Sequence, residues 1–153
     1  MIKRRINVRG IIFRDGHVLA QQLTPDHHGR QRDYWCTPGG GLEETESLID
    51  GLSREMVEET GITPTVGRLL FIQQFDDGEN EQLEFFFNIE NVNDYDHIDL
   101  TSTSHGLAEI KNVAFVDPKT VWLLPEFLQT IDIASYIERS RDVLIINNLR
   151  KTN

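Results

Sequence analysis

The sequence is poor in cysteine and in long apolar runs. Its 153 residues include one cysteine, Cys36, so a single chain cannot form an internal disulfide or a metal centre built from several thiolates. Such low cysteine content is typical of a reducing compartment, and we expect a cytoplasmic protein. The basic start of the chain precedes only Ile11, Ile12 and Phe13, a run too short for a signal-peptide core or a membrane span.

Positive charge is also scarce. The chain has 15 lysines and arginines against 25 aspartates and glutamates, a formal net charge of -10. A surface of this sign repels a phosphodiester backbone, which argues against DNA or RNA polymers as partners. A small anionic nucleotide stays compatible, because divalent cations held by acidic side chains reverse the local sign. The length and the 39% hydrophobic content predict a single folded domain over residues 1–153.

The first forty residues predict strands and turns. A hairpin is expected from residues 2–13 and 18–20, with Asp15 and Gly16 in its turn. A polar loop then leads to a short strand at 34–36 and a tight turn at 38–41.

A helix follows the glycine-rich segment. Leu48, Leu52 and Met56 recur every four residues, Thr45 is the candidate N-cap, and Gly61 marks the end. Beyond the helix we expect a hairpin from strands 66–75 and 83–89, a polar excursion over 91–105, a strand at 110–116, a C-terminal helix with Pro125 in its first turn, and a short last strand at 143–146. This order predicts an α/β fold with helices on the faces of a mixed sheet.

Three carboxylates lie in one sector of the expected helix. Glu55, Glu58 and Glu59 occupy relative positions 0, 3 and 4, where like charges repel, and they lie near the C-terminus, where the helix dipole disfavours anions. Arg54 can pair with Glu58, but an exposed pair of this kind contributes only about 0.3–0.5 kcal/mol. A hard divalent cation, Mg²⁺ or Mn²⁺, would offset the repulsion far better. The alternative is an ordinary solvated charged face.

The spacing upstream of these glutamates is specific. Gly40 is followed after five residues by Glu46, and after seven more by the run from Arg54 to Ile62. This segment, residues 40–62, resembles the Nudix box at every defining position. The resemblance implies a Nudix fold, an α/β/α sandwich around a mixed sheet, and a hydrolase that uses Mg²⁺, or Mn²⁺, to cleave nucleoside diphosphates linked to another moiety.

The resemblance also implies roles for single residues. The implied metal ligands are Glu55, Glu58, Glu59 and a backbone carbonyl of Gly39 or Gly40. Glu46 and Arg54 support them; we expect Arg54 and Glu58 to take part in catalysis, with one of the glutamates as general base. A glycine run fits because it lets the backbone approach a metal–phosphate cluster, although an ordinary tight turn is the alternative.

Members of the family carry a further carboxylate from a later loop or strand. Glu109 is our candidate, with Asp76, Asp77 and Glu79 as competitors and an exposed surface glutamate as the bland alternative.

Substrate contacts are harder to assign from the sequence. His28, Arg30 and Arg32 form a basic loop in an acidic chain, and we expect them to contact substrate phosphates, with plain solvation as the alternative. The aromatic residues of the strands are more typical of a core than of base stacking.

The subclass of substrate also stays open. Beyond the box, residues 76–79 carry neither the proline often found in ADP-ribose pyrophosphatases nor the tyrosine of diadenosine polyphosphate hydrolases. Our first hypothesis is therefore a nucleoside triphosphate pyrophosphohydrolase. An ADP-ribose or nucleotide-sugar pyrophosphatase and a non-catalytic nucleotide sensor are the alternatives, and a homodimer is an open alternative to a monomer.

Overall fold

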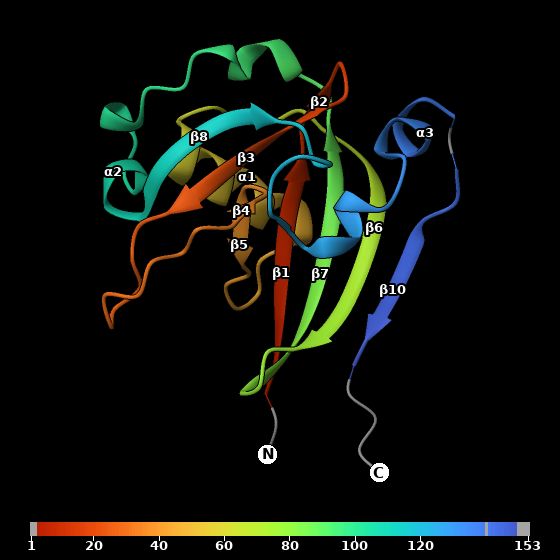
Figure 1. Cartoon of the computed structure of the whole chain (residues 1–153), viewed down its shortest axis with the longest axis horizontal. Helices are drawn as coiled ribbons and strands as arrows, with labels where there is room; N and C mark the ends of the chain where they lie inside the picture. Colours follow the sequence, from red (N-terminus) through yellow and green to blue (C-terminus); the bar gives the residue numbers. More distant parts are fainter. Residues whose placement is uncertain (1–2, 140, 150–153) are drawn as a thin grey trace.

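Two β-sheets and one long helix make up the framework of the computed structural model, which describes residues 3–139 and 141–149 (Figure 1). The first sheet contains β1 (Lys3–Ile11), β5 (Gly39–Gly41), β6 (Val66–Asp76), β7 (Asn80–Ile89) and β10 (Leu144–Asn148), in the order β10-β6-β7-β1-β5. The second contains β2 (Phe13–Arg14), β3 (His17–Leu23), β4 (Trp35–Cys36), β8 (Ile110–Val116) and β9 (Leu123–Leu124). Because β1 and β7 are parallel while β6 and β7 are antiparallel, the first sheet is mixed, and the expected α/β class is confirmed.

Helices flank the sheets. The α-helices are α1 (Leu48–Thr60), α2 (Gly106–Glu109) and α3 (Ile133–Glu138), and the 3-10 helices are η1 (Val92–Asp96), η2 (Leu100–Ser102) and η3 (Glu126–Gln129). One apolar cluster joins the two sheets to η3 and α3. A second packs Leu52 and Met56 of α1 against the sheets. Among the described residues, no helix is long and apolar enough to cross a membrane.

The N-terminal hairpin differs from the prediction in one respect. Asp15 and Gly16 form the turn, with φ of 51° and 78°, but the turn joins β2 to β3. The expected long first strand is interrupted at Ile12, and β1 pairs with β7 and β5 instead. The break has a packing reason: Ile11 and Ile12 are both fully buried, in different apolar clusters. One continuous segment therefore supplies a strand to each sheet.

The ends of α1 are partly as predicted. Gly61 ends the helix in a left-handed conformation, with φ of 75°. The N-cap is Ser47 rather than Thr45: the Ser47 hydroxyl accepts a hydrogen bond from the Asp50 amide at 3.1 Å, as an N-cap should. Thr45 has a positive φ of 64° and lies in the preceding turn.

The C-terminal prediction is also corrected. Pro125 comes before a 3-10 helix, and the expected single helix is divided into η3 and α3. The predicted last strand is present as β10.

Gly39, Gly40 and Gly41 form a strand, where the sequence suggested a tight turn. β5 pairs antiparallel with β1, Gly39 opposite Arg9 and Gly41 opposite Asn7. Gly39 has φ of 140°, and a Cβ there would lie 2.0 Å from the backbone oxygen of Val8. Only glycine permits this approach.

We predict that Gly39→Ala lowers the free energy of unfolding by about 3 kcal/mol or more, because it adds a backbone clash to an unfavourable φ. Gly16→Ala is the control, since its φ is also positive but no atom lies within 4 Å of the added Cβ; it should cost about 1–2 kcal/mol. Urea unfolding measures both, and equal losses would contradict the clash.

Candidate active site

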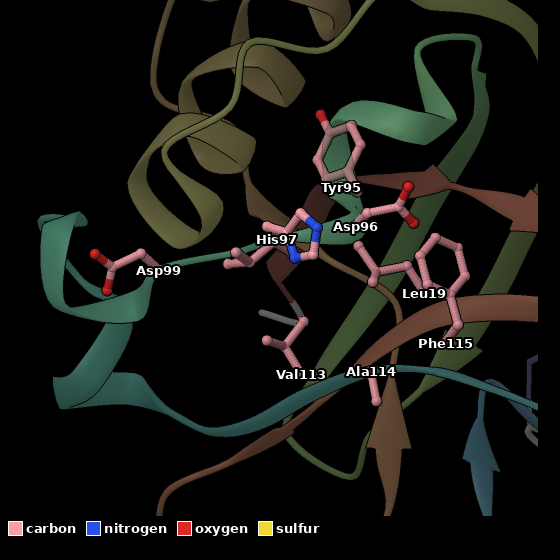
Figure 2. Close-up of a pocket in the computed structure, with 9 residues that line it drawn as sticks. Leu19, Tyr95, Asp96, His97, Asp99, Val113, Ala114 and Phe115 are labelled. Carbon is pink, nitrogen blue, oxygen red and sulfur yellow. The ribbon is translucent and has the colours of Figure 1, made fainter.

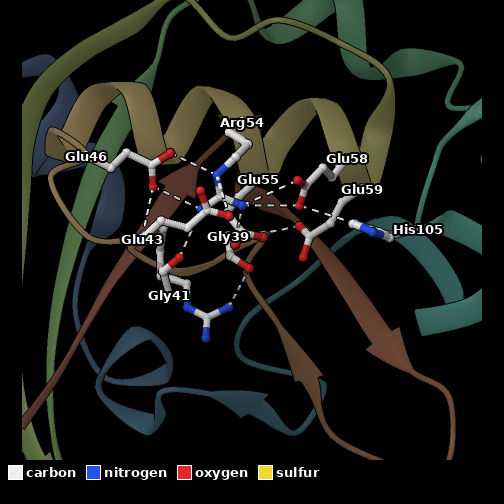
Figure 3. Close-up of polar contacts among 10 residues, drawn as sticks. Gly39, Gly41, Glu43, Glu46, Arg54, Glu55, Glu58, Glu59 and His105 are labelled. Carbon is white, nitrogen blue, oxygen red and sulfur yellow. Dashed lines mark hydrogen bonds and ion pairs between the residues drawn. The ribbon is translucent and has the colours of Figure 1, made fainter.

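Arg54 is the centre of a carboxylate cluster on α1 (Figure 3). Its guanidinium donates to both oxygens of Glu46, at 2.8 and 3.0 Å, and to Glu55 at 3.1 Å. It also lies 3.3 Å from Glu58 and donates to the backbone oxygen of Gly41 at 3.1 Å. One cation therefore binds three carboxylates and the end of the glycine strand.

The predicted glutamates of α1 come together but have different surroundings. Glu59 is 6% exposed and accepts a hydrogen bond from the Gly39 amide at 3.0 Å; burial raises its pKa to about 7. Burial also raises the pKa of Glu55. The Glu58 carboxylate lies 3.2 Å from Nδ1 of His105, which the sequence analysis did not single out. The helix thus presents one inward-facing carboxyl group and two at the edge.

The glycine strand lies directly against these carboxylates. A Cβ on Gly40 would be 2.6 Å from the carboxyl carbon of Glu55, so any side chain there would displace the glutamate. Backbone oxygens and carboxylate oxygens are thereby held side by side. Such oxygens are the donors that Mg²⁺ and Mn²⁺ prefer, and the residues present fit such an ion. In residues 3–139 and 141–149, no three acidic, histidine or cysteine side chains are already gathered into a metal site, since Arg54 pairs with Glu55 and Glu58.

A cavity of about 680 Å³ opens beside the cluster, between the two sheets. Glu55, Glu59 and the three glycines of β5 line one end, and Glu109 lines it from α2. The volume is in the range of small-molecule sites. Of the competing later carboxylates, Asp77 lines the cavity, whereas Asp76 and Glu79 do not.

Sequence reasoning missed the polar wall of this cavity. Arg5, Asn7 and Arg9 alternate along β1 and face it, as do Gln82 and Glu84 on β7. Polar residues at every second strand position were the available signal, but the signal does not say which sheet face is enclosed. Arg9 donates to the buried Glu84 at 3.0 Å and to the backbone oxygen of Thr37 at 3.2 Å.

The predicted basic loop lies away from the cavity lining. Arg30 is paired with Asp26 at 2.7 Å, with 73% of its side chain exposed. Arg32 donates to the backbone oxygen of Thr24, and His28 is exposed. None of His28, Arg30 and Arg32 lines the cavity, and Arg5 and Arg9 are the cationic side chains that do.

A second cavity, of about 400 Å³, is lined by residues of β3 and β8 and by the segment 95–99 (Figure 2). Leu19, Val113 and Phe115 supply its apolar part, and Asp96 and His97 lie beside them. Asp96 is paired with Arg14, and no glutamate of α1 lines this cavity. The glycine strand, Glu55 and Glu59 thus belong to the larger cavity.

We predict an acid-sensitive contribution of Glu46 to stability. The hydrogen bonds from Arg54 and the Glu43 amide lower the pKa of Glu46 from 4.5 to about 2. Its stabilising effect should be complete above pH 4.5 and disappear as the pH falls to about 2. The free energy of unfolding should therefore fall less steeply over this range in Glu46→Gln than in the wild type. Glu44→Gln, an exposed control, should follow the wild type. Parallel curves for all three would contradict the role of Arg54.

Comparison with known proteins agrees with this arrangement. The family model described as NUDIX domain matches residues 3–134. Diphosphoinositol polyphosphate phosphohydrolase 2 of Rattus norvegicus is 32% identical over 63 residues, covering 41% of this chain and 35% of the relative. The 8-oxo-dGTP diphosphatase of Proteus vulgaris is 34% identical over 73 residues, covering 46% of this chain and 62% of the relative.

Both matches leave more than a third of the relative uncovered. Among solved structures, the E. coli ORF135 protein has a TM-score of 0.69 and 23% identity, covering 92% of this chain and 96% of its own, which shows a common fold. The family match over most of the chain shows more: the protein belongs to the Nudix family.

Proposed function

We propose that this chain is a Mg²⁺-dependent pyrophosphohydrolase that cleaves nucleoside triphosphates to the monophosphate and pyrophosphate. The observation that carries the proposal is the position of the box residues: Glu55 and Glu59 line a nucleotide-sized cavity together with the glycine strand. Carboxylates beside backbone oxygens at the wall of such a cavity are suited to a phosphate chain that arrives with its cation.

The charge of the cavity favours a nucleotide over a more highly phosphorylated ligand. Its lining has two cationic side chains, Arg5 and Arg9, and Arg9 is already paired with Glu84. A ligand with phosphates on many sides, such as the inositol polyphosphate named for the rat relative, would place charge against carboxylates. A nucleotide carries its charge at one end and a neutral base at the other. The Proteus relative is named for a nucleotide of this kind.

In this proposal Glu55, Glu58 and Glu59 hold Mg²⁺, or Mn²⁺, with a backbone carbonyl of Gly39 or Gly40. Bound there, the ion would neutralise charge on the pyrophosphate and lower the pKa of a water molecule. Arg54 acts through the glutamates, since it fixes Glu55 and Glu58 from one guanidinium group. Glu46 in turn fixes Arg54.

Proton transfer is assigned to a carboxylate at the edge of the site. Glu58 is the first candidate for the general base, because its oxygen lies 3.2 Å from Nδ1 of His105, which can orient the carboxylate. Glu109 is the alternative, since its exposed side chain lines the cavity. In both cases the base takes a proton from the attacking water, whose oxygen forms a bond to one of the two phosphorus atoms that share the α–β bridging oxygen. That phosphorus loses its bond to the bridging oxygen, which leaves with the other phosphorus, so that the products are the monophosphate and pyrophosphate.

We expect nucleoside triphosphates and Mg²⁺ to yield phosphate after added inorganic pyrophosphatase. ADP-ribose and nucleotide sugars are tested in parallel with added phosphatase. EDTA should abolish product formation, and excess Mg²⁺ should restore it. A signal confined to ADP-ribose or the sugars would overturn the triphosphate assignment. Tight nucleotide binding without product would indicate a sensor.

Glu58→Gln should lower kcat by about 10²-fold or more, because it removes a charge proposed to hold the metal and to accept a proton. Circular dichroism and thermal unfolding should stay close to those of the wild type, since Glu58 is at the helix edge. Glu44→Gln alters a nearby exposed carboxylate and should keep full activity. Near-normal turnover in Glu58→Gln would contradict the proposed mechanism.

A further inference from the structure

The wall of the cavity formed by the first sheet is organised in rows that cross the strands in register. The row nearest the core contains Phe71 and Phe86, both fully buried. The next row contains Asn7, Glu84 and Gln73 on β1, β7 and β6. On the other side of Asn7, the same row continues to Gly41 of β5. Along β6 and β7 the face therefore changes from aromatic to polar between one row and the next.

The polar row is buried although it lines a cavity. Asn7, Glu84 and Gln73 are 6%, 5% and 6% exposed. Asn7 donates to Gln82 at 2.7 Å and Glu84 accepts from Arg9 at 3.0 Å, but the side-chain oxygen of Gln73 has no hydrogen-bond partner among the residues that the structure describes. A buried amide without a partner is costly, so this position calls for a ligand that donates to it.

The opposite wall also contains buried side-chain oxygens of this kind. Gln21 of β3 and Thr37, which follows β4, are each 1% exposed and line the cavity, and among the described residues the side-chain oxygen of each lacks a partner. In the part of the chain that the structure describes, four buried side-chain atoms have no partner, and three of them belong to residues of this one cavity. The residues that carry these oxygens therefore gather around one cavity.

The ends of the polar row match the two ends of a nucleotide. Gly41 accepts from Arg54 and lies beside the carboxylate cluster, whereas Gln73 is three strands away, about 14 Å at the usual strand spacing. Phosphates held at the glycine strand would place a base near Glu84 and Gln73. Phe75 and Phe127 also line this part of the molecule's cavity and offer flat apolar surfaces.

We propose that Glu84 and Gln73 read the base by accepting hydrogen bonds from its exocyclic amino group, so that a nucleotide whose base carries this amine, such as cytosine or guanine, is preferred over the matched nucleotide whose base lacks it. This inference rests on the proposed function and deepens it. A carboxylate is an acceptor only, and the free Gln73 oxygen is a second acceptor. A base that presents a carbonyl there, such as uracil, would oppose two acceptors and leave both unsatisfied, which sites built for hydrogen bonding penalise strongly.

The test compares ligand pairs that differ at the amine: CTP with UTP, and GTP with ITP. For the wild type we expect kcat/KM at least about tenfold higher for the amine-bearing member of each pair. Gln73→Met keeps the volume and removes the amide, and each preference should fall below about threefold. Its melting temperature should equal or exceed that of the wild type, because an unpartnered buried amide is replaced by an apolar group. A purely structural role for Gln73 would give the opposite change in stability.

Gln74→Met is the matched control, because Gln74 is the next residue of β6 and lies on the opposite face of the sheet. It should retain the wild-type preferences. Equal kcat/KM within both wild-type pairs, or unchanged preferences in Gln73→Met, would overturn the inference.

Binding of monophosphates separates this inference from the proposed function. CMP, UMP, GMP and IMP lack the anhydride bond, and calorimetry measures their affinities directly. Tighter binding of CMP and GMP without hydrolysis of any triphosphate would refute the proposed activity and support base reading. Hydrolysis of all four triphosphates at equal rates would support the proposed activity and refute base reading.

Discussion

The close approach of β5 to β1 and α1 is the constraint on which the site depends. Gly39 lies so near the Val8 carbonyl that no side chain fits, and Gly40 touches the Glu55 carboxylate in the same way. The backbone of β5 therefore contacts the helix without intervening atoms. Its amide at Gly39 meets Glu59, and its carbonyl at Gly41 meets Arg54. The strand converts a helix face into one wall of a cavity.

Charge balance is the second requirement. The carboxylates of α1 and β7 lie close together, and each group is compensated by one arginine. Arg54 offsets Glu46, Glu55 and Glu58, and Arg9 offsets Glu84. Within residues 3–139 and 141–149, Glu59 has no such ion pair, and burial raises its pKa to about 7. An ionised carboxyl group that is buried without a paired charge is costly, so this end of the cavity is suited to a ligand that brings positive charge with it.

Local signals in the sequence were sufficient for α1. The four-residue apolar spacing, Gly61 and the three glutamates all lie within one segment, and the helix brings them together as its period requires. The same holds for the Asp15–Gly16 turn and for β10. The Ser47 cap was missed because Thr45 and Ser47 are both capping residues two positions apart.

Long-range pairing explains what the sequence did not reveal. The pairing of β1 with β7 joins residues about 77 positions apart, and no local pattern specifies it. In the sequence Arg5, Asn7 and Arg9 are indistinguishable from exposed polar strand residues, and it is this pairing that encloses them. The phosphate role predicted for the basic loop rests on its charge and on its place before the glycine segment, and neither signal shows that local hydrogen bonds hold Arg30 to Asp26 and Arg32 to Thr24.

The interruption of the first strand at Ile12 limits how this protein can diverge. The segment from Lys3 to Arg14 serves one sheet before Ile12 and the other after it, with both ends fixed in register. Insertion or deletion of one residue in β1 would turn Arg5, Asn7 and Arg9 to the opposite face and bury the wrong set. Related sequences should therefore conserve the length of this segment more strictly than the identity of its side chains. Added residues should be tolerated in exposed turns such as 77–79.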